Sequence, residues 1–320
     1  MKEYGGYLPF ELRKGCEWYT GESVIALNSA RYGIVYAVRD AGYRKIHIPF
    51  YMCDTVKDAL DKYGIAYELY HFDEKFEPAG LNVRDREAVL YPNYYGLCSA
   101  DKCARILQTY KNVIFDNTQA FFAPPVKGAY NVYSCRKFIG VSDGAYVVKE
   151  GIVRQSLEAD ISYGRMTYLF KCMEEGTNAA YPDSLDLEQT LTDSPMRSMS
   201  ALTHMLMQNA DYEMIITARK ENYRKLDQLL GKANGYAPVL KEECIPMIYP
   251  FLVEDEELRH RLVSEYHIYI PQWWKVLLER EGMTSFEERM IRYLLPLPVD
   301  QRYNGTDMEA MASCIMRAVK

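Results

Sequence analysis

The sequence has no long apolar run, no concentration of positive charge and no pattern of metal ligands. Its apolar segments are broken by charged residues, so none reaches the roughly 20 apolar residues that cross a membrane as a helix. Lysine and arginine are scattered along the chain, and the formal net charge of −6 does not suit a polyanionic partner. We therefore expect neither a membrane nor a nucleic acid as a partner.

The cysteines and histidines indicate no metal site. The eight cysteines include no C-x-x-C pair, and the five histidines, at positions 47, 71, 204, 260 and 267, lack the spacing of metal ligands. Unpaired thiols are typical of the reducing cytosol. The first six residues contain no apolar signal core. These features favour a cytoplasmic protein that holds no metal.

What the sequence does contain is an alternation of short apolar runs and amphipathic stretches. With 320 residues, 48% of them hydrophobic, the chain can bury a large core. Strands are predicted at residues 45–49, 66–72, 88–93, 112–116, 130–134 and 145–149. Helical spacing predicts helices at residues 29–40 and 54–63. The pattern predicts an α/β fold: a mainly parallel central sheet, sandwiched by helices, that binds ligands at the carboxyl ends of its strands.

The rest of the chain has a different character. Residues 161–191, with glycine, proline and polar clusters, are predicted to be irregular, whereas residues 198–230 have a long helical pattern. Further elements are then expected, namely a strand at 247–253, a helix at 256–265, a strand at 268–270 and a helix at 307–319. We predict a large domain, residues 1–214, and a smaller C-terminal α/β domain, residues 215–320.

Asp116 and Lys137 are the most informative pair. Asp116 ends the apolar run of residues 113–115, and Lys137 lies three residues after Ser134, the last residue of another predicted strand. Because the carboxyl ends of neighbouring parallel strands meet in one crevice, the two side chains are predicted to face the same ligand. Pyridoxal-phosphate (PLP) chemistry requires such a pair: a lysine amine that forms an imine, and a carboxylate that keeps the pyridine nitrogen protonated. The Ser134 hydroxyl can then donate to the cofactor phosphate.

Spacing alone leaves structural interpretations open. An aspartate after a strand is also typical of a turn or a helix cap. A lysine beside Arg136 is also typical of a solvated surface.

A series of short motifs makes the whole chain similar to a known family. They are, in order, Gly5-Gly6-Tyr7, Leu27-Asn28-Ser29-Ala30-Arg31, Ile48-Pro49-Phe50-Tyr51, Asn93-Tyr94-Tyr95-Gly96-Leu97, Asp116-x-x-Gln119-Ala120, Ser134-x-x-Lys137 and Asp143-Gly144-Ala145. In this order they resemble the DegT-type (DegT/DnrJ/StrS) sugar aminotransferases, a branch of the fold-type I PLP enzymes. The resemblance implies the PLP-dependent aspartate-aminotransferase fold, with a small C-terminal domain.

The resemblance also implies roles for individual residues. Lys137 matches the Schiff-base lysine, Asp116 the carboxylate on the pyridinium, and Gln119 the side chain near the ring hydroxyl. Ser134 matches the serine that binds the cofactor phosphate.

Ser29, Ala30 and Arg31 match the helix N-terminus that holds the same phosphate, where free amides and the helix dipole favour an anion. An ordinary N-cap at residues 28–29 would have the same sequence.

The chain departs from the family pattern at three places. Its phosphate turn, residues 28–31, contains no glycine. Many relatives have an aromatic residue that stacks on PLP where this chain has Cys53, so Tyr51 or Phe50 is expected to take that role. The Asn-Tyr-Arg sequence that reaches the partner subunit's phosphate in relatives is reduced here to Arg197.

The resemblance implies an aminotransferase that moves an amino group from an amino acid, expected to be glutamate, to a keto sugar. This sugar is expected to be nucleotide-linked and to serve a surface polysaccharide or similar glycan. Tyr95, Trp273 and Arg302 are the candidate substrate-binding residues, because aromatic rings stack on sugars and bases and arginine binds phosphate or carboxylate. A core position for Trp273 and a structural salt bridge for Arg302 stay open. A homodimer with active sites at its interface is expected.

Other functions are weighed against this one. An amino-acid transaminase needs an arginine for each substrate carboxylate, and Arg302 is the nearest fit. A PLP-dependent sugar dehydratase is disfavoured, because such relatives replace the Schiff-base lysine by histidine. A non-catalytic PLP-fold or nucleotide-sugar-binding protein needs neither Lys137 nor Asp116, yet both are present.

Overall fold

The predicted apolar runs form one large sheet. The computed structural model describes residues 4–236 and 238–319. The eight strands of the sheet are β1 (Val24–Leu27), β2 (Lys45–Pro49), β3 (Ala66–Phe72), β4 (Pro78–Ala79), β5 (Glu87–Pro92), β6 (Val113–Asn117), β7 (Tyr130–Ser134) and β8 (Ala145–Val148). Their order is β1-β8-β7-β6-β5-β2-β3-β4. The inner strands from β3 to β7 pair in parallel, whereas β4, β8 and β1 are antiparallel to their neighbours.

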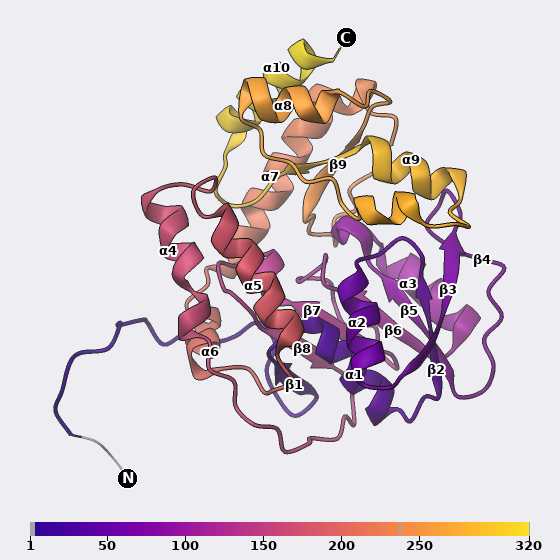
Figure 1. Cartoon of the computed structure of the whole chain (residues 1–320), viewed down its shortest axis with the longest axis vertical. Coiled ribbons are helices and arrows are strands. Elements are labelled where there is room, and N and C mark those ends of the chain that lie inside the picture. The colour runs from indigo at the N-terminus through magenta and orange to yellow at the C-terminus, as the bar shows by residue number, and fades with distance from the viewer. Residues whose placement is uncertain (1–3, 237, 320) are drawn as a thin grey trace.

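Helices cover the sheet and continue into a second unit (Figure 1). The α-helices are α1 (Ala30–Asp40), α2 (Asp54–Lys62), α3 (Ala100–Tyr110), α4 (Thr167–Glu174), α5 (Tyr181–Asp193), α6 (Ala201–Gln208), α7 (Tyr212–Leu230), α8 (Leu258–Tyr266), α9 (Ser285–Tyr293) and α10 (Gly305–Ala318). Short 3₁₀ helices are η1 (Tyr94–Gly96), η2 (Cys135–Lys137), η3 (Tyr163–Arg165), η4 (Gly231–Ala233) and η5 (Lys275–Glu279). The antiparallel pair β9 (Ile248–Leu252) and β10 (Leu294–Pro298) forms a second sheet. No helix in the described part of the chain is long and apolar enough to cross a membrane.

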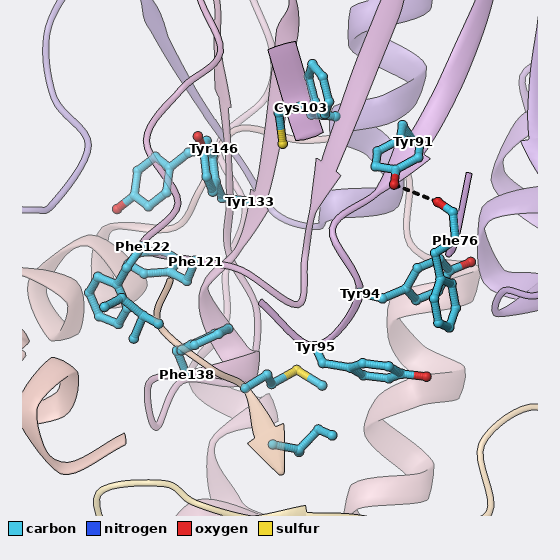
Figure 2. Close-up of a cluster of buried hydrophobic side chains, with 14 of the residues drawn as sticks. Phe76, Tyr91, Tyr94, Tyr95, Cys103, Phe121, Phe122, Tyr133, Phe138 and Tyr146 are labelled. Atoms are coloured by element: carbon cyan, nitrogen blue, oxygen red, sulfur yellow. Dashed lines mark hydrogen bonds between the residues drawn. The ribbon is translucent and has the colours of Figure 1, made fainter. Parts of the chain in front are cut away.

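Alternating side chains of the large sheet build two cores on its opposite faces. On β6, Ile114 packs into the core that contains α1 and α2, whereas Phe115 packs into the core on the other face. This second core is rich in aromatic rings, and Figure 2 shows the Tyr91 hydroxyl donating to the backbone carbonyl of Phe76 at 2.7 Å. It extends to Ile248 and Leu294, so the second unit packs on this face of the sheet.

Two glycines permit close approaches between neighbouring elements of the fold. A β-carbon at Gly33 in α1 would lie 2.7 Å from Cγ1 of Val132, so the glycine lets α1 pack directly on β7. A β-carbon at Gly96, where φ is +74°, would lie 2.4 Å from the backbone oxygen of Ile245. Substitution at either position forces the neighbouring backbone or side chains to move.

The structure confirms the α/β prediction and corrects several details. Residues 161–191, predicted to be irregular, contain α4 and most of α5. The long helix expected at 198–230 is two helices, because Asp211 starts α7 as an N-cap that accepts from the Met214 amide at 3.0 Å. Residues 268–270 form no strand, and β10 pairs with β9 instead. The domain division between residues 214 and 215 falls inside α7 and stays a prediction.

Candidate active site

A pocket of about 340 Å³ opens at the carboxyl ends of the parallel strands. It is lined by residues from the ends of β5, β6 and β7, from the start of α1, from the loop before α2 and from the second unit. Eight residues proposed from the sequence line it, namely Ser29, Ala30, Arg31, Asp116, Gln119, Ser134, Lys137 and Trp273. The roles assigned to them stay predictions, but the tertiary structure brings these residues together.

Asp116 lies near the end of β6 with 6% of its surface exposed. Its Oδ1 accepts a hydrogen bond from the Thr118 amide at 3.0 Å. Burial raises the pKa of this carboxyl, while the bonds to Thr118 and the charge of Lys137 oppose the rise. A cationic ligand nitrogen beside Asp116 would therefore compensate a charge that the protein solvates poorly.

Lys137 ends the single turn η2, just beyond β7. The residue as a whole is exposed to solvent, whereas its amine is closely surrounded by protein. Desolvation, and next the cation of Arg136, lower the pKa of Lys137 to about 8. Roughly a tenth of the amines are then neutral at pH 7, against about one in three thousand for an ordinary lysine. Its side chain makes no hydrogen bond or ion pair with the described residues, so it is available as a nucleophile.

Gln119 is fixed by the backbone of η1. The Tyr95 amide donates to Oε1 of Gln119 at 2.8 Å. The Tyr95 carbonyl in turn accepts from the Met247 amide at 2.8 Å, which ties η1 to the second unit. This arrangement leaves the NH₂ group of Gln119 as a donor in the pocket that Asp116 also lines.

One end of the pocket is suited to an anion. Ser29 starts α1, and its side chain makes no capping bond. The hydroxyls of Ser29 and Ser134 have no hydrogen-bond partner among the residues that the structure describes. The first N–H groups of α1 have no acceptor within the helix, and the helix dipole favours negative charge there. With Arg31, also in the lining, these groups can hold a phosphate ester.

Asn28 positions this helix start rather than capping it. Its Nδ2 donates to the Pro195 carbonyl at 2.9 Å, and its Oδ1 accepts from the Arg197 amide at 3.2 Å. Its own carbonyl accepts from the Gly144 amide at 3.0 Å. Asn28 therefore ties α1 both to the chain before α6 and to the start of β8.

The structure does not place Tyr51 and Tyr95 in the pocket lining. Both are buried, and their hydroxyl oxygens lie 3.2 Å apart. The Tyr51 ring meets Trp274 edge-on at 4.5 Å, and the Tyr95 ring stacks on Trp273 at 6.0 Å. The two tyrosines thus stand behind the two tryptophans, which do line the pocket. Tyr95 and Trp274 have positive φ values of 61° and 56°, a strained backbone conformation typical of functional sites.

The structure also places two arginines away from the pocket lining. The Arg302 guanidinium pairs with both carboxylate oxygens of its neighbour Asp300, at 2.7 and 2.9 Å. Arg197 pairs with Glu158 at 3.1 Å and with Asp160 at 3.6 Å. Within this chain, neither arginine joins the residues around Lys137.

Several lining residues were not assigned a role from the sequence. They are Cys53, Arg136 and Glu188. Arg136 could have been found as the neighbour of Lys137. Glu188 gave no signal, because it lies in a segment whose helix was not predicted. No cluster of metal-binding side chains occurs within the described residues.

Solved structures show which fold carries this pocket. The aminotransferase TlmJ from Streptoalloteichus hindustanus superposes with a TM-score of 0.63, at 15% identity over 93% of this chain and 86% of its own. The fold is that of the PLP-dependent aminotransferases of fold type I.

Other aminotransferases show the same fold. The sugar aminotransferase Spr1654 from Streptococcus pneumoniae, described as putative and solved in its PMP form, gives a TM-score of 0.64 at 12% identity, over 92% of this chain and 87% of its own. DesI, solved with its TDP-sugar product, gives 0.62 at 15% identity, over 93% and 81%. No protein-family profile and no curated protein sequence matches the chain. The aminotransferase fold predicted from the motifs is thus confirmed by these structures.

Proposed function

We propose that this protein is a PLP-dependent aminotransferase that moves an amino group from an amino acid to a keto sugar. The observation that carries the proposal is the meeting of Asp116 and Lys137 in one pocket, beside an anion site at the start of α1. This combination fits PLP, which has an aldehyde, a pyridine nitrogen and a phosphate. A protein that only bound a nucleotide sugar would need neither Asp116 nor Lys137.

Different residues of the pocket would bind different parts of PLP. Lys137 would bind its aldehyde carbon, Asp116 its ring nitrogen and Gln119 its ring hydroxyl. Ser29, Ser134 and the first turn of α1, with Ala30 and Arg31, would receive its phosphate. PLP, once bound, supplies an electron sink for the carbon that carries the amino group.

Asp116 and Lys137 would have distinct parts in the transfer. Asp116 would keep a proton on the ring nitrogen. Because Asp116 is buried, its attraction for the protonated nitrogen would be stronger than in water. Lys137, released as a free amine whose pKa is about 8, would take up and return the proton at the substrate carbon. Trp273 and Trp274 would wall the pocket against water.

Aromatic groups at the pocket support a sugar or nucleotide as the acceptor. Trp273 and Trp274 present large ring surfaces to the cavity, with Tyr51 and Tyr95 packed behind them. DesI, which shares this fold, was solved with a TDP-sugar product. We extend this substrate class to the present chain, with glutamate as the donor and glycan synthesis in the cytoplasm as the context.

A homodimer is part of the proposal. Large apolar side chains are exposed on α4 and α5, notably Phe170, Met173, Tyr181 and Leu185. Several large apolar side chains exposed on two neighbouring helices are typical of protein interfaces. A second copy of the chain is the partner that we propose for it.

The test of the acceptor is a panel of half-reactions. The protein is loaded with pyridoxamine phosphate, and keto sugar nucleotides are offered beside simple 2-oxo acids. We expect keto sugar nucleotides to restore the PLP absorbance at useful rates. If only 2-oxo acids do so, the protein is an amino-acid transaminase.

A further inference from the structure

Three charged side chains meet at the anion end of the pocket. Nη2 of Arg31 lies 3.5 Å from Oε2 of Glu188, and Arg136 forms an ion pair with the other carboxylate oxygen, Oε1. Nη1 of Arg31 also donates to Oγ1 of Thr192 at 2.7 Å. All three charged residues line the pocket with Ser29 and Ser134. Glu188 thus bridges two arginines beside the groups proposed to bind phosphate.

The two arginines need an anion between them. Burial lowers the pKa of Arg136, and the positive charge of Arg31 adds to this effect. Arg31 has only 9% of its surface exposed, so water cannot screen its charge well. A carboxylate bridge relieves this repulsion with a single negative charge.

The Glu188 side chain is not enclosed by protein at this position. Its side chain is 44% exposed, and among the described residues of α5 only Glu188 lines the pocket. The helix is attached by its carboxyl end, where Nζ of Lys62 donates to the carbonyls of Asp193 at 3.0 Å and Ser194 at 2.9 Å. The Glu188 side chain can therefore turn toward solvent while α5 stays docked.

We propose that Arg31 and Arg136 are phosphate ligands and that Glu188 occupies their site until a phosphate ester displaces it. A dianion satisfies both guanidinium groups at once, together with the free hydroxyls and the start of α1. The two arginines thereby replace the glycine-containing turn that this chain lacks. The inference deepens the proposed function, on which it rests for the identity of the ester as PLP.

The test uses the full-length, cofactor-free protein and pyridoxine 5′-phosphate, titrated by calorimetry. This probe has the phosphate of PLP but no aldehyde, so its binding does not depend on a bond to Lys137. We expect Arg136→Gln to weaken binding about tenfold or more, because a charge-assisted pair is lost. We expect Glu188→Gln to tighten binding roughly fivefold, because the competing carboxylate is gone.

Matched controls separate this site from general charge effects. Glu242 bridges Lys220 and Arg224, at 2.9 and 2.7 Å, on the second unit and away from the pocket. Glu242→Gln likewise removes a carboxylate that bridges two cations, here on an exposed surface, and should leave binding unchanged. Pyridoxine without phosphate should bind all variants equally. Arg136→Lys keeps the charge but loses the planar fork, so it should lie between Arg136→Gln and the wild type, whether or not Arg136→Gln folds well.

Clear results would overturn the inference. Glu188→Gln binding no tighter than Glu242→Gln would show that Glu188 does not compete with phosphate. Arg136→Gln and Arg136→Lys both binding like the wild type would remove Arg136 from the site. If the expected pattern appears but PLP never links to Lys137, the anion site stands and the proposed function fails.

Discussion

The carboxylate of Asp116 and the amine of Lys137 face one pocket, and each favours the charged form of the other. The charge of Lys137 lowers the pKa of Asp116, and the charge of Asp116 raises the pKa of Lys137. In both residues, desolvation is the larger effect and acts in the opposite direction. Burial thus shifts both pKa values toward the neutral forms, and the mutual attraction of the two groups partly offsets that shift, as is typical of functional sites.

The first prediction concerns the attachment point of the cofactor. The purified protein, supplied with PLP, should be yellow, and borohydride should then fix the cofactor on Lys137. Peptide mapping by mass spectrometry locates the reduced adduct. An adduct on another lysine, or the absence of any adduct, would contradict the assignment of Lys137 as the attachment point.

The second prediction concerns pH. The rate at which PLP couples to Lys137 should rise with pH around a midpoint near 8, because only the neutral amine attacks and the pKa is lowered to about 8. Arg136→Gln should move the midpoint up, since it removes a cation that lowers this pKa. Asp116→Asn should move it down, since it removes an anion that raises it. Stopped-flow absorbance at each pH measures the midpoints, and shifts in the same direction for both variants would contradict the electrostatic account.

The third prediction separates cofactor binding from turnover. Asp116→Ala should keep some PLP but lose roughly a hundredfold or more in kcat, the loss typical of a missing electrostatic partner in a buried site. The physical reason is that nothing then holds the ring nitrogen protonated. Steady-state kinetics, with PLP content measured on the same sample, checks this. Turnover close to that of the wild type would remove Asp116 from the mechanism.

The fourth prediction concerns the packing of α1. Gly33→Ala should lower the free energy of unfolding by about 1–3 kcal/mol, because its β-carbon would overlap Val132. Gly164→Ala is the matched control, since its β-carbon meets no atom within 4 Å. Denaturant unfolding of both variants gives the comparison. Equal stability would show that α1 does not lie as close to β7 as described.

The fifth prediction concerns assembly. Light scattering should give twice the chain mass of 37.1 kDa. Met173→Asp, on exposed α4, should shift the mass toward the monomer, because a charge would enter an apolar interface. Met316→Asp, on the exposed surface of α10, should leave the dimer intact. A fully active monomer would contradict the proposal.

The sequence by itself determined the α/β fold and the meeting of Asp116 with Lys137. Short apolar runs such as residues 113–115, bounded by polar residues, are typical of buried strands, so their pattern predicts the sheet. Adjacent parallel strands then bring their carboxyl ends to one edge, and β6 pairs in parallel with β7 as that rule requires. Both inferences depend on local periodicity and on a general rule of topology.

Only the tertiary structure decided which distant side chains enter the pocket. Glu188 on α5 pairs with Arg31 on α1 and with Arg136 after β7, and no local pattern encodes a contact between segments so far apart in the sequence. Tyr51 and Tyr95 have the residue type of ligand-stacking groups, yet they pack behind Trp274 and Trp273. Side-chain direction depends on the sum of long-range packing and charge, which residue spacing along the chain does not contain.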